Sequence, residues 1–248
     1  MTKIHFERLC KSFEGGLQVL NGVQLGIEKG ESHIILGQSG CGKSVLLKCL
    51  LGIQKITSGD IIVDGISVQD ERRFGEYLRK FSILFQGNAL FDSMTILENV
   101  IFGANQVRRD KFECRKLAEE KLFAVGLEKR VFDLYPAEIS GGMQKRAALA
   151  RAIAVEPEIL LFDEPTSGLD PITGGVICNL LKNTIKSLGV TALTITHDLK
   201  VAEFLADRVS VLNQGTVVWT GRTKDMETCG NGYVIRFHQA SSLSGTVA

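Results

Sequence analysis

Residues 34–44 form one continuous motif, which reads Ile34-Ile35-Leu36-Gly37-Gln38-Ser39-Gly40-Cys41-Gly42-Lys43-Ser44. Its first three residues are typical of a short buried strand, and the other eight match G-x-x-x-x-G-K-[ST]. The glycines let the backbone curl so that successive N–H groups point inward at phosphate oxygens. Lys43 can reach the β- and γ-phosphates, and the Ser44 hydroxyl can hold Mg²⁺. Because residues 45–51 predict a helix directly after the loop, the motif indicates a nucleoside triphosphate site.

A second motif, at residues 159–164, is an apolar run that ends in Asp163 and Glu164. A carboxylate at the end of a buried strand is costly unless it has a partner, and a magnesium ion beside the phosphate loop would be one. Asp163 is the expected residue on the metal side. Glu164, one residue further along, is the expected general base for a water that attacks the γ-phosphate. Taken alone, acidic residues at the end of a strand cap the next helix about as often as they serve a catalytic site.

Composition excludes several classes of protein. The 248 residues include 29 Lys and Arg against 28 Asp and Glu, so there is no basic excess and we expect no nucleic-acid partner. No run approaches the roughly 18 apolar residues of a membrane span, and residues 1–5 lack the apolar segment of a signal peptide. Six dispersed cysteines and four histidines predict neither a disulfide framework nor a zinc site, which favours the reducing cytoplasm.

Hydrophobic patterning divides the chain into an α/β body, an N-terminal antiparallel flank and a helical insert. Alternating apolar residues before residue 28 predict half-exposed strands, whereas the continuous runs 159–162 and 191–196 predict buried parallel strands. Helical spacing dominates from about Asp92 to Ala154, and residues 209–219 predict a hairpin. The small polar residues 239–248 predict a loose tail.

A third motif, Ser140-Gly141-Gly142-Met143-Gln144, opens a predicted helix and forms a second glycine-rich anion cradle. Alone, Ser140 fits an ordinary N-cap. Followed by Lys145-Arg146 and then by the strand of Asp163, it resembles the signature motif of the ATP-binding-cassette ATPases. Ile139 stands where leucine commonly begins that motif.

The other landmarks of that family occur in the same order along the chain. Gln86 matches the glutamine that contacts Mg²⁺ and the attacking water, and Ser167-Gly168-Leu169-Asp170 matches the loop that meets the partner subunit. His197 matches the switch histidine near the γ-phosphate. Phe13 stands where these proteins stack an aromatic ring on adenine, although core packing is the plainer role for it.

The resemblance implies a fold, a reaction and a set of site residues. The fold is a P-loop NTPase (RecA-like) core with an antiparallel β flank and an inserted α-helical subdomain, and the reaction is ATP hydrolysis with Mg²⁺. The implied catalytic residues are Glu164, His197, Lys43 and Gln86. The implied metal ligands are Ser44, Gln86 and Asp163. The implied nucleotide-binding residues are Phe13, Gly37, Gln38, Ser39, Gly40, Cys41, Gly42, Lys43, Ser44, Val45, Ser140, Gly141, Gly142 and Gln144. Val45 replaces a hydroxyl residue that many members carry.

The resemblance also implies an assembly and domain boundaries. Two copies would pair head to tail as a homodimer, with ATP between the phosphate loop of one chain and the Ser140 helix of the other. An integral membrane permease would bind this dimer at the cytoplasmic face of the inner membrane. Within one domain spanning 1–248, we expect the core at about 1–87 and 155–228, the helical subdomain at about 88–154 and a tail at 229–248.

The transported cargo is predicted from residues 84–95, which read Leu-Phe-Gln-Gly-Asn-Ala-Leu-Phe-Asp-Ser-Met-Thr. This run resembles the ATPases of MCE-type (Mla) phospholipid transporters, which implies phospholipid transport and an MCE-domain partner subunit. The alternative is an importer or exporter of a small polar solute such as an amino acid, since amino-acid importers share every catalytic motif. A soluble cluster-assembly ATPase without transport is a third possibility.

Overall fold

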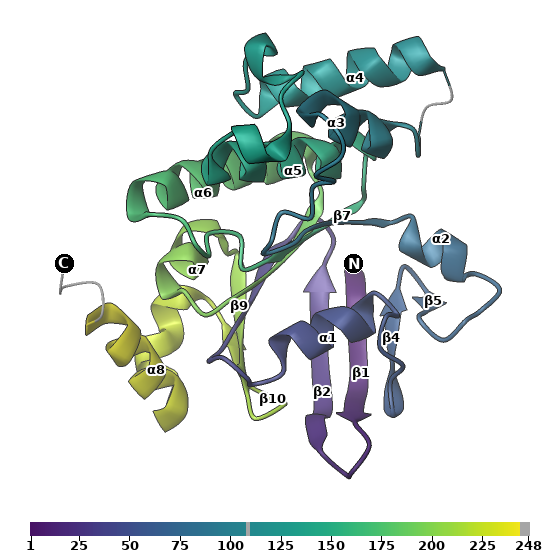
Figure 1. Cartoon of the computed structure of the whole chain (residues 1–248). Helices are drawn as coiled ribbons and strands as arrows, with labels where there is room; N and C mark the ends of the chain where they lie inside the picture. Colours follow the sequence, from purple (N-terminus) through teal and green to yellow (C-terminus); the bar gives the residue numbers. More distant parts are fainter. Residues whose placement is uncertain (108–109, 244–248) are drawn as a thin grey trace. The chain divides into compact units, whose positions relative to one another are not determined.

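The computed structural model describes residues 1–107 and 110–243, which form two compact units (Figure 1). The first unit comprises Met1–Lys80 and the described part of Gly189–Ala248. The second unit is Phe81–Leu188. These units do not follow the expected subdomain limits at 88 and 154, which remain predictions. The expected tail at 229–248 belongs to the first unit as far as residue 243, and its last five residues lie outside the described part.

An antiparallel sheet opens the first unit, with strand order β2-β1-β4-β5. Its strands are β1 (Thr2–Ser12), β2 (Gln18–Glu28), β4 (Ser58–Val63) and β5 (Ile66–Ser67). Ile4, Phe6 and Val23 are fully buried and polar residues alternate with them, as the sequence pattern predicts. Asp64 (φ 48°) and Gly65 (φ 76°) form the tight turn between β4 and β5, and positive φ at both positions is what a type I′ hairpin turn requires.

A parallel sheet carries the phosphate loop in the same unit. Strand β3 (Ser32–Leu36) lies between β8 (Thr191–Thr196) and β9 (Arg208–Asn213) and is parallel to both. Strand β10 (Thr216–Gly221) pairs with β9 as the predicted hairpin. All residues of β3 and β8 are buried, which explains their continuous apolar runs. Helix α1 (Lys43–Leu50) follows the loop, and α2 (Phe74–Leu78) comes after β5.

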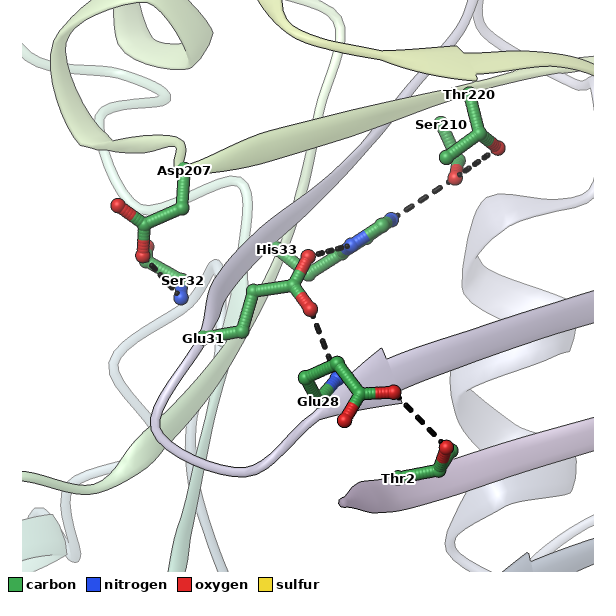
Figure 2. A network of polar contacts seen from close by, with 8 residues as sticks. All are labelled: Thr2, Glu28, Glu31, Ser32, His33, Asp207, Ser210 and Thr220. Carbon is green, nitrogen blue, oxygen red and sulfur yellow. Dashed lines mark hydrogen bonds and ion pairs between the residues drawn. The ribbon is translucent and has the colours of Figure 1, made fainter.

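A chain of buried polar contacts joins the strands of the first unit (Figure 2). The His33 ring, which is fully buried, bonds Glu31 Oε1 through Nδ1 at 2.8 Å and Ser210 Oγ through Nε2 at 2.8 Å. Ser210 Oγ lies 2.8 Å from Thr220 Oγ1 on β10, and Glu31 Oε2 accepts a bond from the backbone N–H of Glu28 at 2.8 Å. The buried imidazole therefore has a partner at each nitrogen.

The second unit joins a two-stranded parallel pair to a set of helices. Strand β6 (Phe81–Leu84) pairs with β7 (Ile159–Asp163). The helices are α3 (Ile96–Ala104), α4 (Lys111–Ala124), α5 (Gly141–Ala154) and α6 (Pro171–Leu188), with 3₁₀ turns at Lys129–Val131 and Pro136–Glu138. Thr95 and Glu98 form a capping box at α3, and Asp110 and Ser140 cap α4 and α5. The predicted helical character of the segment from Asp92 to Ala154 is confirmed, except at residues 108–109, which lie outside the described part.

The C-terminal part of the first unit differs from the predicted loose tail. After β8 come α7 (Leu199–Leu205), a 3₁₀ segment (Thr223–Thr228) and α8 (Gly232–Leu243). Residues 239–243 are therefore helical, because Val234 and Phe237 bury an apolar stripe that holds the helix in place. Among the described residues, no helix is both long and apolar enough to cross a bilayer.

Candidate nucleotide-binding site

The phosphate loop is closed around the side chain of Lys43. The buried Lys43 ammonium donates to the carbonyl oxygens of Gly37 at 2.6 Å and Gln38 at 3.0 Å. Because no acidic residue occupies the first turn of α1, the positive end of the helix dipole is not offset locally. The loop therefore presents an ammonium group and a helix N-terminus at one place, the combination that binds phosphate.

Two glycines of the loop are required by the backbone. A Cβ on Gly37 would lie 2.5 Å from the Leu212 carbonyl oxygen and 2.7 Å from Cys41 Sγ. Gly42 has φ 110° and its Cβ would lie 3.0 Å from Leu20 Cδ2. Side chains at either position would move the loop away from β2 or β9.

The remaining loop residues differ in exposure. Cys41 is buried and Val45 is half-buried, whereas Ser44 is exposed. At the front of the loop, Gln38, Ser39 and Gly40 are also exposed. The exposed groups are those that a bound triphosphate would contact first.

Phe13 and His197 lie in the same unit as the loop. Phe13 is 37% exposed, which argues against core packing, and Lys11 Nζ lies 4.7 Å from its ring centroid. His197 follows β8 and is exposed. The Gly37 N–H donates to the Thr196 carbonyl at 3.3 Å, so His197 begins next to the loop and lines the same cavity as Gln38.

Asp163 and Glu164 belong to the second unit. Asp163 is the last residue of β7, and both carboxylates are half-buried. Glu164 has φ 47°, a left-handed conformation that is uncommon for a side-chain-bearing residue and is concentrated at functional sites. The chain therefore leaves the extended conformation of β7 directly after Asp163.

Gln86 is held by two groups of its own unit. Its side-chain Nε2 donates to Ser167 Oγ at 3.0 Å, and its backbone carbonyl accepts a bond from Lys145 Nζ at 2.7 Å. Lys145 is only 2% exposed. Burial lowers the pKa of Lys145, and the nearby Asp163 carboxylate acts in the opposite direction.

Lys145 is a residue of this site that the sequence motifs did not single out. It precedes the buried Ala148, Leu149 and Ala152 of α5 by three, four and seven residues, so it lies on the same apolar face of the helix. In the sequence, the signal for this residue is a lysine at a position of the helical pattern that faces the core, where a charged side chain needs a partner.

The glycines after Ser140 allow a close approach at the start of α5. Ser140 Oγ accepts from the Met143 N–H at 3.3 Å, and a Cβ on Gly142 would lie 2.8 Å from Thr173 Cγ2. A cavity of about 280 Å³ opens here, lined by Ser140, Gly142 and Arg146 among others. The helix N-terminus thus faces an open, polar recess.

Gln144 uses its side chain inside the second unit. Its Nε2 donates to the carbonyl of Pro136 at 2.9 Å, and its Oε1 accepts from Asn88 Nδ2 at 3.3 Å. These bonds fix the segment that leads into Ser140. Direct contact between Gln144 and a nucleotide, as the resemblance implies, stays a prediction.

The residues expected to hold Mg²⁺ are oxygen donors divided between the units, with Ser44 in the first and Gln86 and Asp163 in the second. Hydroxyl, amide and carboxylate oxygens suit this ion, which commonly keeps waters and substrate phosphates as its other ligands. Within the described residues, no group of three or more His, Cys, Asp and Glu could hold a metal by itself.

Comparisons with known proteins agree with this geometry. The sequence model of the family described as "ABC transporter" matches residues 20–167. The glutamine transport ATP-binding protein GlnQ of Escherichia coli is 42% identical over 88% of this chain and 90% of its own length. The methionine import ATP-binding protein MetN 1 of Bacillus cereus is 38% identical over 91% of this chain, which spans 66% of that relative.

Solved structures of ATP-binding cassettes have the same fold. A dimeric post-hydrolysis structure of the cassette MJ0796 with ADP and Pi has a TM-score of 0.79 and 34% identity, covering 89% of this chain and 98% of that one. The structure of cbiO1 from Clostridium perfringens, part of the ABC transporter complex cbiONQ, has a TM-score of 0.83 and 30% identity, covering 98% and 99%. The predicted fold class is confirmed.

These relatives correct the cargo prediction. They are ATP-binding proteins for glutamine and methionine, so they favour the small-solute alternative and support neither phospholipid transport nor an MCE-domain partner. Within residues 84–95, Asn88 (φ 61°) and Ala89 (φ 51°) both have positive φ, as in a turn. The Phe91 ring packs edge-on against the Phe102 ring, with 5.0 Å between the ring centroids.

The match over more than half of the chain, the identity to GlnQ and the shared cassette fold lead to one conclusion. The chain belongs to the ABC transporter family, as an ATP-binding subunit with ATPase activity.

Proposed function

We propose that this chain hydrolyses ATP to power the transport of a small polar solute, such as an amino acid, through a separate membrane permease. The observation that carries the proposal is the 42% identity to a glutamine transport ATP-binding protein over nearly the whole of both chains. The methionine import proteins support the same class of cargo. The subunit would act at the cytoplasmic face of the inner membrane as a peripheral protein.

Within the first unit, the phosphate loop would bind the nucleotide. The Lys43 ammonium would exchange its bonds to Gly37 and Gln38 for bonds to the β- and γ-phosphates, while the loop N–H groups surround the phosphates. The half-exposed Phe13 ring would stack on the adenine, a contact worth about 1 kcal/mol.

The second unit would supply the groups that act on the attacking water. Glu164 would accept the proton of the water, Gln86 would orient it, and His197 of the first unit would contact the γ-phosphate. Ser44, Gln86 and Asp163 would hold Mg²⁺, which when bound neutralises charge on the phosphate oxygens. The bond that the Gln86 side chain donates to Ser167 Oγ and the bond that its carbonyl accepts from Lys145 hold both ends of the residue, which supports this orienting role.

The active form would be a head-to-tail homodimer. The dimeric MJ0796 structures, one with ADP and Pi, support this assembly. Ser140, Gly141 and Gly142 of the partner would close on the γ-phosphate that Lys43 holds, so ATP would join the two chains and its hydrolysis would release them. The open recess at the start of α5 supports such a contact.

A reconstituted transporter would test the proposed function. The chain should be purified with the permease that co-purifies with it, placed in lipid nanodiscs, and assayed for phosphate release with single amino acids and the matching solute-binding protein. We expect stimulation by one amino acid and none in a Glu164→Gln variant. Stimulation by added phospholipid instead, without response to any amino acid, would overturn the proposed cargo and restore the expectation from residues 84–95.

A further inference from the structure

A cavity of about 480 Å³ lies between the phosphate loop and helix α8, within the first unit. Its lining residues come from the loop, the end of β8 and α8, and include Gln38, Ser39, His197, Tyr233, Arg236 and Phe237. The roles assigned above use the loop and His197. They leave α8 without a function, although its side chains form the opposite wall.

The charge of this wall favours an anion. Arg236 contributes a guanidinium, and none of the described residues that line the cavity is acidic. The loop on the other side holds Lys43 and the N-terminus of α1. Positive groups on both sides raise the local concentration of a negative ligand.

The hydroxyl of Tyr233 lacks a partner in the described part of the chain. It is buried and makes no hydrogen bond there. Burial is the main cause that raises the pKa of Tyr233, with a smaller contribution from Cys41, so the group keeps its proton and can donate. A buried polar group without a hydrogen-bond partner is unfavourable. An acceptor oxygen of a ligand in the cavity would give the Tyr233 hydroxyl the partner that it lacks.

Helix α8 is fixed rigidly enough to position this hydroxyl. Asn231 Oδ1 caps the helix by accepting from the N–H groups of Tyr233 at 3.0 Å and Val234 at 3.3 Å. The Asn231 amide also donates to the Val218 carbonyl at 3.1 Å, which ties the helix to β10. Val234 is fully buried and Phe237 is 7% exposed, so one face of α8 is part of the core.

The Arg236 side chain is exposed and extends back over the first turn of α8. Its Nη1 lies 3.4 Å from the position that a Cβ on Gly232 would take. Within residues 1–107 and 110–243, no carboxylate pairs with it. The guanidinium is therefore available to a ligand in the cavity.

We propose that α8 completes the nucleotide site of its own chain: the Tyr233 hydroxyl and the Arg236 guanidinium bind the terminal phosphate of the triphosphate held by the phosphate loop. This inference rests on the phosphate loop being the nucleotide site. A diphosphate lacks the group that these residues contact. Helix α8 therefore distinguishes ATP from ADP, and it does so before a partner chain is bound.

Nucleotide affinities of the full-length chain test this inference. Tyr233→Phe and Arg236→Gln should each weaken binding of a non-hydrolysable ATP analogue by about tenfold, because one bond to a charged phosphate is lost, and should leave ADP binding unchanged. Tyr233→Phe should not lower the Tm of the nucleotide-free chain, since the hydroxyl it removes has no partner there. Arg236→Lys should restore part of the loss. Arg222→Gln, an exposed arginine outside the cavity, is the control.

Two results would overturn the role of α8. Equal loss of ATP and ADP affinity would mean that the helix only supports the loop, and unchanged affinity for both would mean that it makes no contact. If the unaltered chain bound neither nucleotide, the phosphate-loop site itself would be wrong, and the inference would fail with it.

Discussion

Lys43 and Lys145 are both buried, and each donates to backbone carbonyls of its own unit. A buried ammonium group is unfavourable without such partners. Lys43 has the exposed front of the phosphate loop beside it, so a phosphate can replace its carbonyl partners. Lys145 is 2% exposed and donates to the Gln86 carbonyl, so no ligand can replace that partner. The bond therefore holds α5 to Gln86, the residue expected to orient the water.

Replacing Lys145 with methionine should separate hydrolysis from nucleotide binding. The stem of the side chain remains, but the Gln86 carbonyl loses its donor, and we expect kcat to fall by about tenfold. ATP affinity should change by less than about twofold, because the phosphate loop belongs to the other unit. Phosphate release and calorimetric ATP binding measure the two effects.

Lys116→Met, at an exposed position of α4, is the matched control and should change neither quantity. Parallel loss of ATP affinity and kcat in Lys145→Met, with native far-UV circular dichroism, would contradict the tie through Gln86.

The sequence predicts residues whose chemistry is local and misses those defined by distant contacts. Lys43 and Ser44 follow from a motif that is complete within eight residues. Lys145 has its partner at Gln86, and the unpartnered hydroxyl of Tyr233 becomes apparent only when α8 is placed against the loop. Neither contact leaves a pattern in the order of residues along the chain.

Helices α3 and α5 approach closely because one position has no side chain. A Cβ on Gly103 would lie 2.7 Å from the Arg151 carbonyl oxygen, a group that cannot rotate away. Gly103→Ala should therefore destabilise the second unit by about 1–3 kcal/mol, since the helices must separate. Thermal unfolding followed by circular dichroism checks this.

Gly75→Ala on α2 is the control for this prediction, because a Cβ there meets nothing within 4 Å. It should leave stability unchanged or raise it by about 0.5–1 kcal/mol through helix propensity. An unchanged Tm in Gly103→Ala would mean that the two helices are not tightly packed.

The polar network that begins at β3 predicts a pH-dependent stability. Burial would raise the pKa of Glu31, but the bonds from His33 and the Glu28 N–H outweigh it and lower the pKa below 4.5. A carboxyl with a lowered folded-state pKa stabilises the fold above its unfolded value, and this contribution is lost as the pH falls through the folded value. Glu31→Gln should cost about 1–3 kcal/mol at pH 7, and progressively less below pH 4.5.

Trp219 on β10 is the only tryptophan and reports on the same sheet, so urea unfolding followed by its fluorescence measures this difference. Glu14→Gln, at an exposed position, is the control. A cost of Glu31→Gln that does not depend on pH would mean that the carboxylate form is not what stabilises the strands.

At the level of elements, periodicity predicted most strands and helices but not α8. Alternation identified β1 and β2 because one face of each is buried, and alanine spacing identified α5. Residues 239–243 read Gln-Ala-Ser-Ser-Leu, and one large apolar residue makes no periodic pattern. They are helical because Asn231 starts the helix and Val234 and Phe237 anchor it earlier in the chain.

At the level of the whole molecule, the head-to-tail dimer can be tested with variants at two residues, Lys43 in the first unit and Gly141 in the second. In that dimer, each ATP site takes Lys43 from one chain and the Ser140 helix from the other. Lys43→Ala removes the phosphate-binding charge. Gly141→Asp should fold, because its Cβ meets only Leu169 at 4.0 Å and a carboxylate is favoured in the first turn of a helix, but it should repel phosphate.

Either variant alone should therefore lack ATPase activity, whereas an equal mixture should recover part of it. If chains pair at random, half of the dimers contain one of each variant, and each of these has one intact site made of an unaltered Lys43 and an unaltered Gly141. The mixture should then show about a quarter of the activity per chain of the unaltered protein. Steady-state phosphate release from the mixed chains, with each variant alone as control, measures this recovery. A mixture as inactive as its components would mean that both groups act in one chain, and the head-to-tail arrangement would be wrong.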